Sequence, residues 1–362
     1  MIRSDAARLP IIDAFKAIAC VLIVLHHLAF YGPMSDVAYP LAPDVFIGLA
    51  RYARMAVQIF FVIAGFLAAK HFFIGPTESF SFWKAVGRRY VRLIGPYSAA
   101  LIAAIVASAI ARLFMDHESI PAPPTLSQFF VHLLLLQSIL GVDALSAGVW
   151  YIAIDFQLFI STLFISFLCW KLIKNPFSRL VINYVLLIGL GLASFFYFNL
   201  NEKWDCYFLY FAGYYVLGII TYQLVSTAKS PSQTLAGILG LIFVIVIALE
   251  IDFRERLIVA LATSLFFIIF FHINKLRSYP HNRSLLYLGR ISYSVFLIHF
   301  PVCLVINALF YYWSPDNPWI NLLGLFIAFG CSLICGALFF RYVEKNLAQR
   351  KLLLSGRANQ YL

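Results

Sequence analysis

The sequence predicts an all-α integral membrane protein with about ten transmembrane helices. Of its 362 residues, 62% are hydrophobic and only 12% are charged, whereas a soluble domain has roughly 45–50% apolar and about 25% charged residues. One soluble core cannot bury such an excess, because a folded chain of this size still needs a polar surface. The composition therefore excludes an ordinary cytosolic enzyme, a disordered chain and a secreted disulfide scaffold.

Ten apolar runs are long enough to cross a bilayer, for which a helix needs about 20 residues. They lie near residues 10–31, 55–74, 93–115, 149–170, 180–199, 206–227, 233–251, 257–274, 291–312 and 320–340. The first run is too long and too polar for a cleavable signal peptide. A further run at 126–140 is shorter, and its length alone does not say whether it crosses.

The distribution of Lys and Arg decides the topology. With a cytoplasmic N-terminus and ten crossings, 19 of these residues lie on the cytoplasmic side and five on the outer side. If 126–140 crossed, most of the Lys and Arg residues after it would lie outside. This is unfavourable, because Lys and Arg are retained in cytoplasmic loops. We therefore expect both termini in the cytoplasm and 126–140 to be re-entrant or interfacial on the outer side. The net charge of +11 comes from these cytoplasmic Lys and Arg residues and does not indicate nucleic-acid binding.

The chain shows no internal repeat and no appended soluble domain. We expect residues 1–345 to form one transmembrane domain and 346–362 a short basic cytoplasmic tail. The six cysteines contain no Cys-x-x-Cys pair, so the sequence indicates neither a metal site nor a disulfide framework.

The first run carries ionisable residues at membrane depth, where they are costly and typical of functional sites. At about 100° per residue, one stripe about 60° wide holds Asp13, Lys16, Cys20 and His27. The neighbouring His26 points to the opposite side. The stripe fits a catalytic groove, but a structural role also stays open, with an Asp13–Lys16 ion pair and His27 bonded to another helix.

A basic cluster, Arg88, Arg89 and Arg92, stands at the cytoplasmic entry of the third run. Arg89 and Arg92 share a helix face, and we expect the helix N-terminus here to add partial positive charge. Guanidinium groups suit a phosphate ligand, because they bind it through two parallel hydrogen bonds. The alternative is an anchor that contacts anionic lipid.

Two later runs add further candidates. Asp155, in the fourth run, is expected at the depth of His27, where a carboxylate could orient the ring or join two helices. In the ninth run, Ser292 and Tyr293 lie at the cytoplasmic end, where a ligand beside the arginines could reach them. His299 lies near the middle of that run and could equally be a packed, hydrogen-bonded histidine.

These motifs together resemble the membrane-bound acyltransferase family 3, in the family's order and over nearly the whole chain. Residues 12–18, IDAFKAI, resemble the family's LDGLRAI, and the family's spacing places its histidine at His27. Residues 60–66 resemble FFVISGF, Arg89 and Arg92 match RxxR, and residues 150–155 resemble WSLSVE, beginning with Trp150. Residues 292–299 match SYSLYLIH, and residues 341–345 resemble RFIEKP, with Glu344 at its acid. Three positions depart from the pattern: Lys16 stands for Arg, Asp155 for Glu and Ala64 for Ser.

The resemblance implies transfer of an acyl group, usually acetyl, from cytoplasmic acyl-CoA to a hydroxyl of a carbohydrate or glycolipid at the outer face. Such acceptors include surface polysaccharides and lipopolysaccharide, and the location implied is a bacterial cytoplasmic (inner) membrane. The three arginines would bind CoA, helped by Lys16, Ser292 and Tyr293. His27 would deprotonate the acceptor, supported by Asp155 and Lys16. Acetyl-CoA would be a co-substrate, with no bound cofactor or metal.

Further site candidates are Asp13, Trp150, His299 and Glu344. Direct transfer and a covalent acyl-histidine both fit the sequence. Two other classes of protein also stay open. One is a transporter or flippase of a lipid-linked saccharide, and the other is an inactive sensor or scaffold that keeps the fold.

Overall fold

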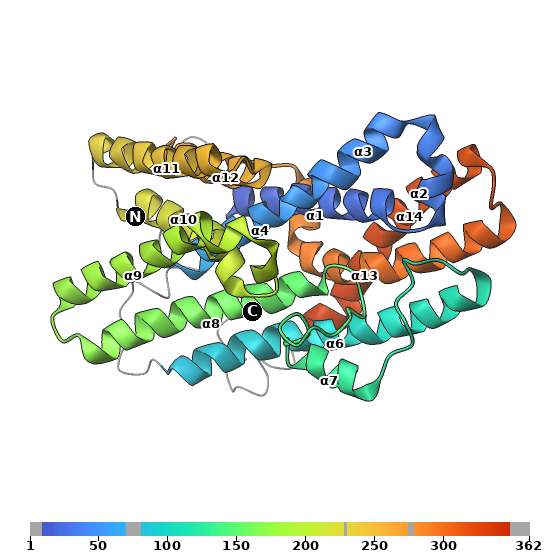
Figure 1. The fold of residues 1–362 in the computed structure, drawn as a ribbon, viewed down its shortest axis with the longest axis horizontal. Coiled ribbons are helices and arrows are strands. Elements are labelled where there is room, and N and C mark those ends of the chain that lie inside the picture. Colours follow the sequence, from blue (N-terminus) through green and yellow to red (C-terminus); the bar gives the residue numbers. More distant parts are fainter. Residues whose placement is uncertain (1–8, 70–80, 228–229, 274–278, 348–362) are drawn as a thin grey trace. The chain divides into compact units, whose positions relative to one another are not determined.

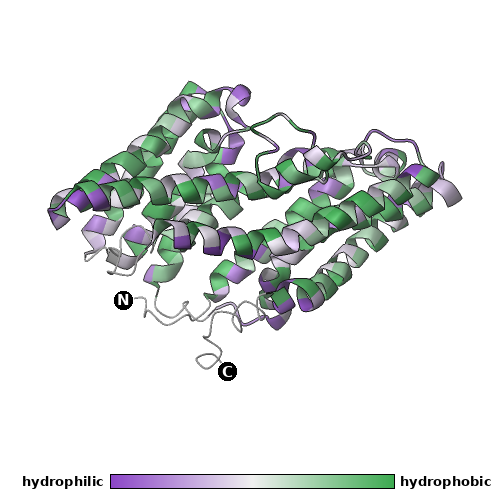
Figure 2. Ribbon diagram, turned by 90° about the horizontal axis from the view of Figure 1, so that it is seen from below, coloured by the Kyte–Doolittle hydropathy of each residue, from purple (hydrophilic) through white to green (hydrophobic). Residues whose placement is uncertain are grey.

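The computed structural model describes residues 9–69, 81–227, 230–273 and 279–347 (Figure 1). Within these ranges, ten helices are long and apolar enough to cross a membrane, which confirms the predicted fold class. Hydrophobic residues cover most of each long helix (Figure 2). The spans are α1 (Pro10–Phe30), α3 with α4 (Pro43–Tyr52 and Ala56–Ala68), α6 (Phe82–Phe114), α8 (Val149–Leu172), α9 (Pro176–Phe196), α10 (Phe208–Thr227), α11 (Pro231–Ile251), α12 (Glu255–His272), α13 (Arg283–Trp313) and α14 (Pro318–Phe339).

Three of the long helices begin with a proline behind a side-chain cap. The caps are Asn175 before α9, Ser230 before α11 and Asn317 before α14. Each cap oxygen accepts a backbone N–H of the first turn, and the proline has no N–H that needs a partner. These helices consequently begin two to four residues before the apolar runs at 180, 233 and 320.

Two helices begin much earlier than their apolar runs. α6 starts at Phe82 rather than near 93, and α13 starts at Arg283 rather than near 291. Hydropathy detects only the part of a helix that suits lipid, whereas basic turns continue the same helix beyond it. The arginine cluster therefore lies inside α6, two to three turns past its start. The prediction that the helix N-terminus adds positive charge at this cluster is wrong, because the helix-dipole effect falls off within the first turn.

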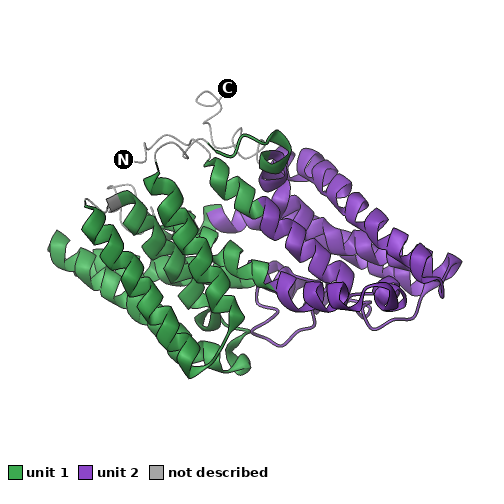
Figure 3. Ribbon diagram, turned by 90° about the horizontal axis from the view of Figure 1, so that it is seen from above, with its two compact units in different colours: residues 1–16, 55–88, 153–286 green, residues 17–54, 89–152, 287–362 purple. Residues whose placement is uncertain are grey.

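The chain divides into two compact units, coloured in Figure 3. Unit 1 comprises residues 1–16, 55–88 and 153–286, and unit 2 comprises residues 17–54, 89–152 and 287–362. Of the predicted tail at 346–362, only Asn346 and Leu347 belong to the described residues.

Unit 1 is held together by a close helix pair and a buried arginine. A Cβ on Gly65 of α4 would collide with the carbonyl of Tyr215 on α10, and one on Gly218 would collide with the carbonyl of Val62. Glycine thus lets the two backbones approach each other, as is common between membrane helices. Arg254, only 6% exposed, donates to the carbonyls of Phe195 and Ala248 and so ties α9 and α11 to the start of α12.

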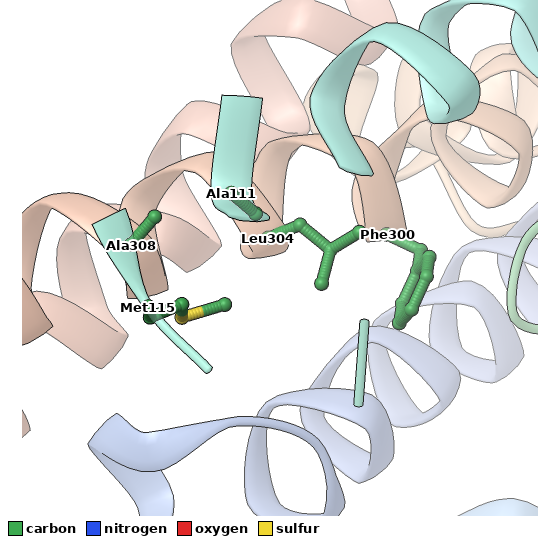
Figure 4. Packing of buried hydrophobic residues seen from close by; sticks show 5 residues of the cluster. All are labelled: Ala111, Met115, Phe300, Leu304 and Ala308. Atoms are coloured by element: carbon green, nitrogen blue, oxygen red, sulfur yellow. The ribbon is translucent and has the colours of Figure 1, made fainter. Parts of the chain in front are cut away.

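Unit 2 has an apolar cluster between α6 and α13 (Figure 4). Its members are Ala111, Met115, Phe300, Leu304 and Ala308, and Tyr31, Ile120 and Ala147 pack against it. The turn after α1 is fixed to α13, because the Met34 N–H donates to the side-chain oxygen of Asn307 at 3.0 Å. The C-terminal halves of α6 and α13 and the turn after α1 therefore share one core.

The segment after α6 turns back alongside that helix. Its only helix, α7 (Leu126–Leu133), is too short to cross a bilayer. The hydroxyl of Tyr90 on α6 donates to the carbonyl of Leu133 at 2.9 Å. Tyr90 lies about 36 Å along the helix from Phe114, at 1.5 Å per residue, which exceeds the roughly 30 Å hydrocarbon thickness. This return along α6 favours the re-entrant alternative, and we call residues 115–148 the re-entrant segment.

Side chains join the two arms of this re-entrant segment. Gln128 donates to the carbonyl of Asp143 at 2.7 Å. His132, fully buried, donates from Nδ1 to the carbonyl of Gln128 and accepts the Leu145 N–H at Nε2. Gln137 donates to the carbonyl of Val149 at 3.3 Å. These bonds replace the backbone pairing that an irregular segment lacks.

Candidate active site

Two histidines from distant parts of the sequence form the centre of the site in unit 2. Nδ1 of His27, on α1, lies 2.6 Å from Nε2 of His299, on α13. The rings are parallel to within 10°, and their centroids are 4.9 Å apart. His27 is 7% exposed and His299 is fully buried. Both were predicted as site residues, but their pairing could not be derived from one sequence.

Gly148 and Tyr31 lie beside His27. A Cβ on Gly148, just before α8, would stand 3.7 Å from Cε1 of His27 and 3.0 Å from the Phe296 ring. Gly148 has φ +80°, a conformation that glycine adopts without strain. Tyr31 packs edge-on against His27 with centroids 5.3 Å apart.

The neighbouring His26 has different surroundings. Its ring stacks on Phe30, one turn along α1, with centroids 5.6 Å apart. His26 and His27 are adjacent and their rings are 5.1 Å apart, but the hydrogen bond to His299 is made by His27. This difference agrees with the helical-stripe argument that separated the two residues.

The arginine motif in unit 2 is connected to the helix that carries His299. The hydroxyl of Tyr293 on α13 donates to the carbonyl of Leu93 on α6 at 3.0 Å. Leu93 directly follows Arg92, whose side chain is exposed, while Arg89 is half-buried. From Tyr293 to His299 is a rise of about 9 Å along the helix, at 1.5 Å per residue. The arginine-bearing turn of α6 is thus two turns of α13 away from the histidine pair.

The other residues of the ninth-run motif make hydrogen bonds within α13 and to other helices. Ser292 donates to the carbonyl of Gly289, and its own carbonyl accepts the Cys20 thiol at 3.5 Å. Ser294 donates to the Glu344 carboxylate at 2.5 Å. The contact of Ser292 and Tyr293 with a ligand stays a prediction. The sequence argument did not single out Ser294, although it occupies the same motif.

The remaining candidates lie mostly in unit 1. Lys16 and Asp13 form an i,i+3 ion pair at 3.9 Å, as the structural alternative predicted. Asp155 is 6% exposed in α8, and Arg88 is exposed near the start of α6. The participation of these unit 1 residues beside His27 or a donor stays a prediction. Trp150 belongs to unit 2, in the first turn of α8.

Two further observations concern the kind of site. Among the described residues, no group of three or more His, Cys, Asp or Glu side chains is placed to hold a metal ion. Sequence reasoning also missed Gly148 and Tyr90. The signals available in the sequence were that Gly148 stands directly before a span and that Tyr90 stands between two motif arginines.

Comparison with known proteins supports the resemblance found in the motifs. A family model described as an acyltransferase domain matches residues 9–341. No curated protein and no solved structure matches this chain significantly. The match includes both histidines, the arginine motif and all ten spans, and it does not favour a transporter. The chain belongs to the acyltransferase family 3 and is an integral membrane acyltransferase.

Proposed function

We propose that this protein transfers an acetyl or other acyl group from cytoplasmic acyl-CoA to a hydroxyl of a carbohydrate or glycolipid at the outer face of a bacterial cytoplasmic membrane. The observation that carries the proposal is the arrangement in unit 2. A buried histidine pair lies two turns of α13 from the contact between Tyr293 and the arginine-bearing turn of α6.

The arginines give the donor a place to bind. CoA carries several phosphates, and guanidinium groups bind phosphate through charge-assisted hydrogen bonds. Arg92 is exposed and Arg89 is half-buried, on one face of α6. A CoA held there would extend its thioester arm along α13 towards His299 and His27. Acyl-CoA is consumed as a co-substrate, and the proposal includes no bound cofactor.

His27 supplies the base. A ring nitrogen of His27 takes the proton of the acceptor hydroxyl while that oxygen attacks the thioester carbonyl. The carbon–sulfur bond then breaks, and the CoA thiolate receives the proton from His27. The products are the acyl ester and free CoA. Imidazole suits this role because its ordinary pKa, about 6.5, lies near neutral pH.

The proposal is tested with the purified full-length protein in proteoliposomes. Acetyl-CoA is added together with surface glycans from a deletion strain, and free CoA is measured with a thiol reagent. We expect CoA release that depends on the glycan, and an acetyl mass increment on the glycan. A lipid-linked saccharide that crosses the bilayer without CoA release would contradict the proposal and support a flippase. The absence of both CoA release and saccharide transport would indicate a sensor or scaffold.

A further inference from the structure

We propose that His299 is a positioning residue that holds the proton of His27 on Nδ1 and leaves Nε2 as the reacting nitrogen. The inference rests on the proposed function, in which His27 is the base, and it names the atom and the partner through which His27 acts. Asp155 was the partner expected from the sequence, whereas the partner that contacts His27 in unit 2 is an uncharged ring.

The tautomer of His299 is set by its own helix. Its Nδ1 lies 2.8 Å from the carbonyl oxygen of Phe296 and 3.2 Å from that of Val295. A carbonyl oxygen only accepts hydrogen bonds, so Nδ1 must carry the proton. In neutral imidazole one nitrogen is a donor and the other an acceptor, and Nε2 of His299 is therefore a lone-pair acceptor. His299 is fully buried, and burial favours the neutral form.

The tautomer of His27 follows from that of His299. The centroid separation of 4.9 Å is much longer than the 2.6 Å between the two nitrogens, while the rings are parallel to within 10°. Such rings meet edge to edge, so the nitrogen–nitrogen contact is an in-plane hydrogen bond. Since Nε2 of His299 accepts, Nδ1 of His27 donates. Neutral His27 then has its lone pair on Nε2.

The other ring nitrogen of His27, Nε2, is left for the acceptor. No hydrogen bond joins Nε2 of His27 to the described residues, and His27 keeps 7% of its surface exposed while His299 has none. A Cβ at Gly148 would stand 3.7 Å from Cε1, the atom next to Nε2, and glycine carries none. An acceptor hydroxyl that approaches His27 thus meets an unprotonated nitrogen.

The pair also has a role after proton transfer. When Nε2 of His27 takes the hydroxyl proton, the ring becomes an imidazolium whose Nδ1–H still donates to His299. His299 in turn donates to the backbone of α13, so the charge is stabilised through two hydrogen bonds. In Ser–His–Asp enzymes an aspartate fixes the histidine tautomer in this way. Here a neutral ring does so, whether His27 acts as base or as nucleophile.

The test compares two replacements of His299. In His299→Gln, the amide oxygen stands near the position of Nε2 and accepts the Nδ1–H of His27. In His299→Leu, the volume is kept and the acceptor is lost. We expect His299→Leu to lower kcat roughly 10²–10⁴-fold, as for loss of general-base function, with little change in KM for acetyl-CoA. His299→Gln should recover most of that loss. Equal losses in both variants, or full activity of His299→Leu, would overturn the proposal.

A spectroscopic measurement separates this inference from the proposed function. Nitrogen-15 spectra of histidine-labelled protein report which ring nitrogen is protonated, whatever reaction the protein performs. The signals are assigned with His27→Gln and His299→Leu. We expect His27 to be protonated at Nδ1 in the wild type and to become a mixture of tautomers in His299→Leu. A wild-type His27 protonated at Nε2 would overturn the inference even if CoA release is observed.

Discussion

The hydroxyl of Tyr293 donates to the carbonyl of Leu93 and so fixes the arginine-bearing turn of α6 against α13. The same helix continues to His299, which bonds His27. Tyr293 therefore joins α6, which we propose binds the donor, to α13, whose His299 bonds the proposed base.

Removing the motif arginines should weaken donor binding. Arg89→Ala and Arg92→Ala each lose charge-assisted phosphate bonds of about 1.5–3 kcal/mol, which predicts a roughly 10–100-fold rise in the apparent KM for acetyl-CoA. Arg179→Ala, which removes another predicted cytoplasmic charge outside the motif, is the control. An unchanged KM in the motif variants would assign the arginines to topology or lipid contact.

A side chain at Gly148 should disturb the histidine site. Gly148→Ala adds a Cβ at 3.0 Å from Phe296 and 3.7 Å from His27, in a conformation with positive φ. Gly141→Ala is a matched control, because Gly141 also has positive φ (+62°) but open space around its Cβ position. Backbone strain should lower the free energy of unfolding of both variants by a similar amount, roughly 1–2 kcal/mol. Only Gly148→Ala should lose most of its kcat. Equal activity in the two would show that the space beside His27 is not needed.

His132 should stabilise the re-entrant segment. His132→Leu removes an acceptor and leaves the buried Leu145 N–H without its partner, which costs about 1–3 kcal/mol. We expect faster proteolysis within 126–148 and a lower Tm in detergent. His281→Leu, at an exposed position, is the control. Identical proteolysis of both variants would argue against this role for His132.

The predicted orientation can be checked by labelling. Cysteines placed at Asp143 and Lys174 should react with an impermeant maleimide from opposite sides, with 143 outside and 174 in the cytoplasm, because the Lys and Arg distribution favours cytoplasmic termini. The wild-type protein with its six cysteines is the background control. Labelling of both positions from one side would refute the orientation.

Much of the fold follows from local properties of the sequence, but the site does not. Ten spans follow from composition, and helical periodicity separated His27 from His26. The boundaries of α6 and α13 did not follow, since basic turns extend each helix beyond its apolar run. The partner of His27 could not be found either. His299 is 272 residues away in sequence, and the rotation that turns it towards α1 depends on the packing of α13. Residue depth along a span, which the sequence does offer, pointed to Asp155, and its role beside His27 stays a prediction.

The most direct test of the central claim compares His27→Ala with His26→Ala in the glycan-dependent CoA-release assay. His27 makes the bond to His299, whereas His26 stacks on Phe30. Loss of a general base lowers the rate by about 10²–10⁴-fold, so His27→Ala should be nearly inactive while it still folds and binds acetyl-CoA. His26→Ala should keep substantial activity. An active His27→Ala, or an inactive but folded His26→Ala, would contradict the account.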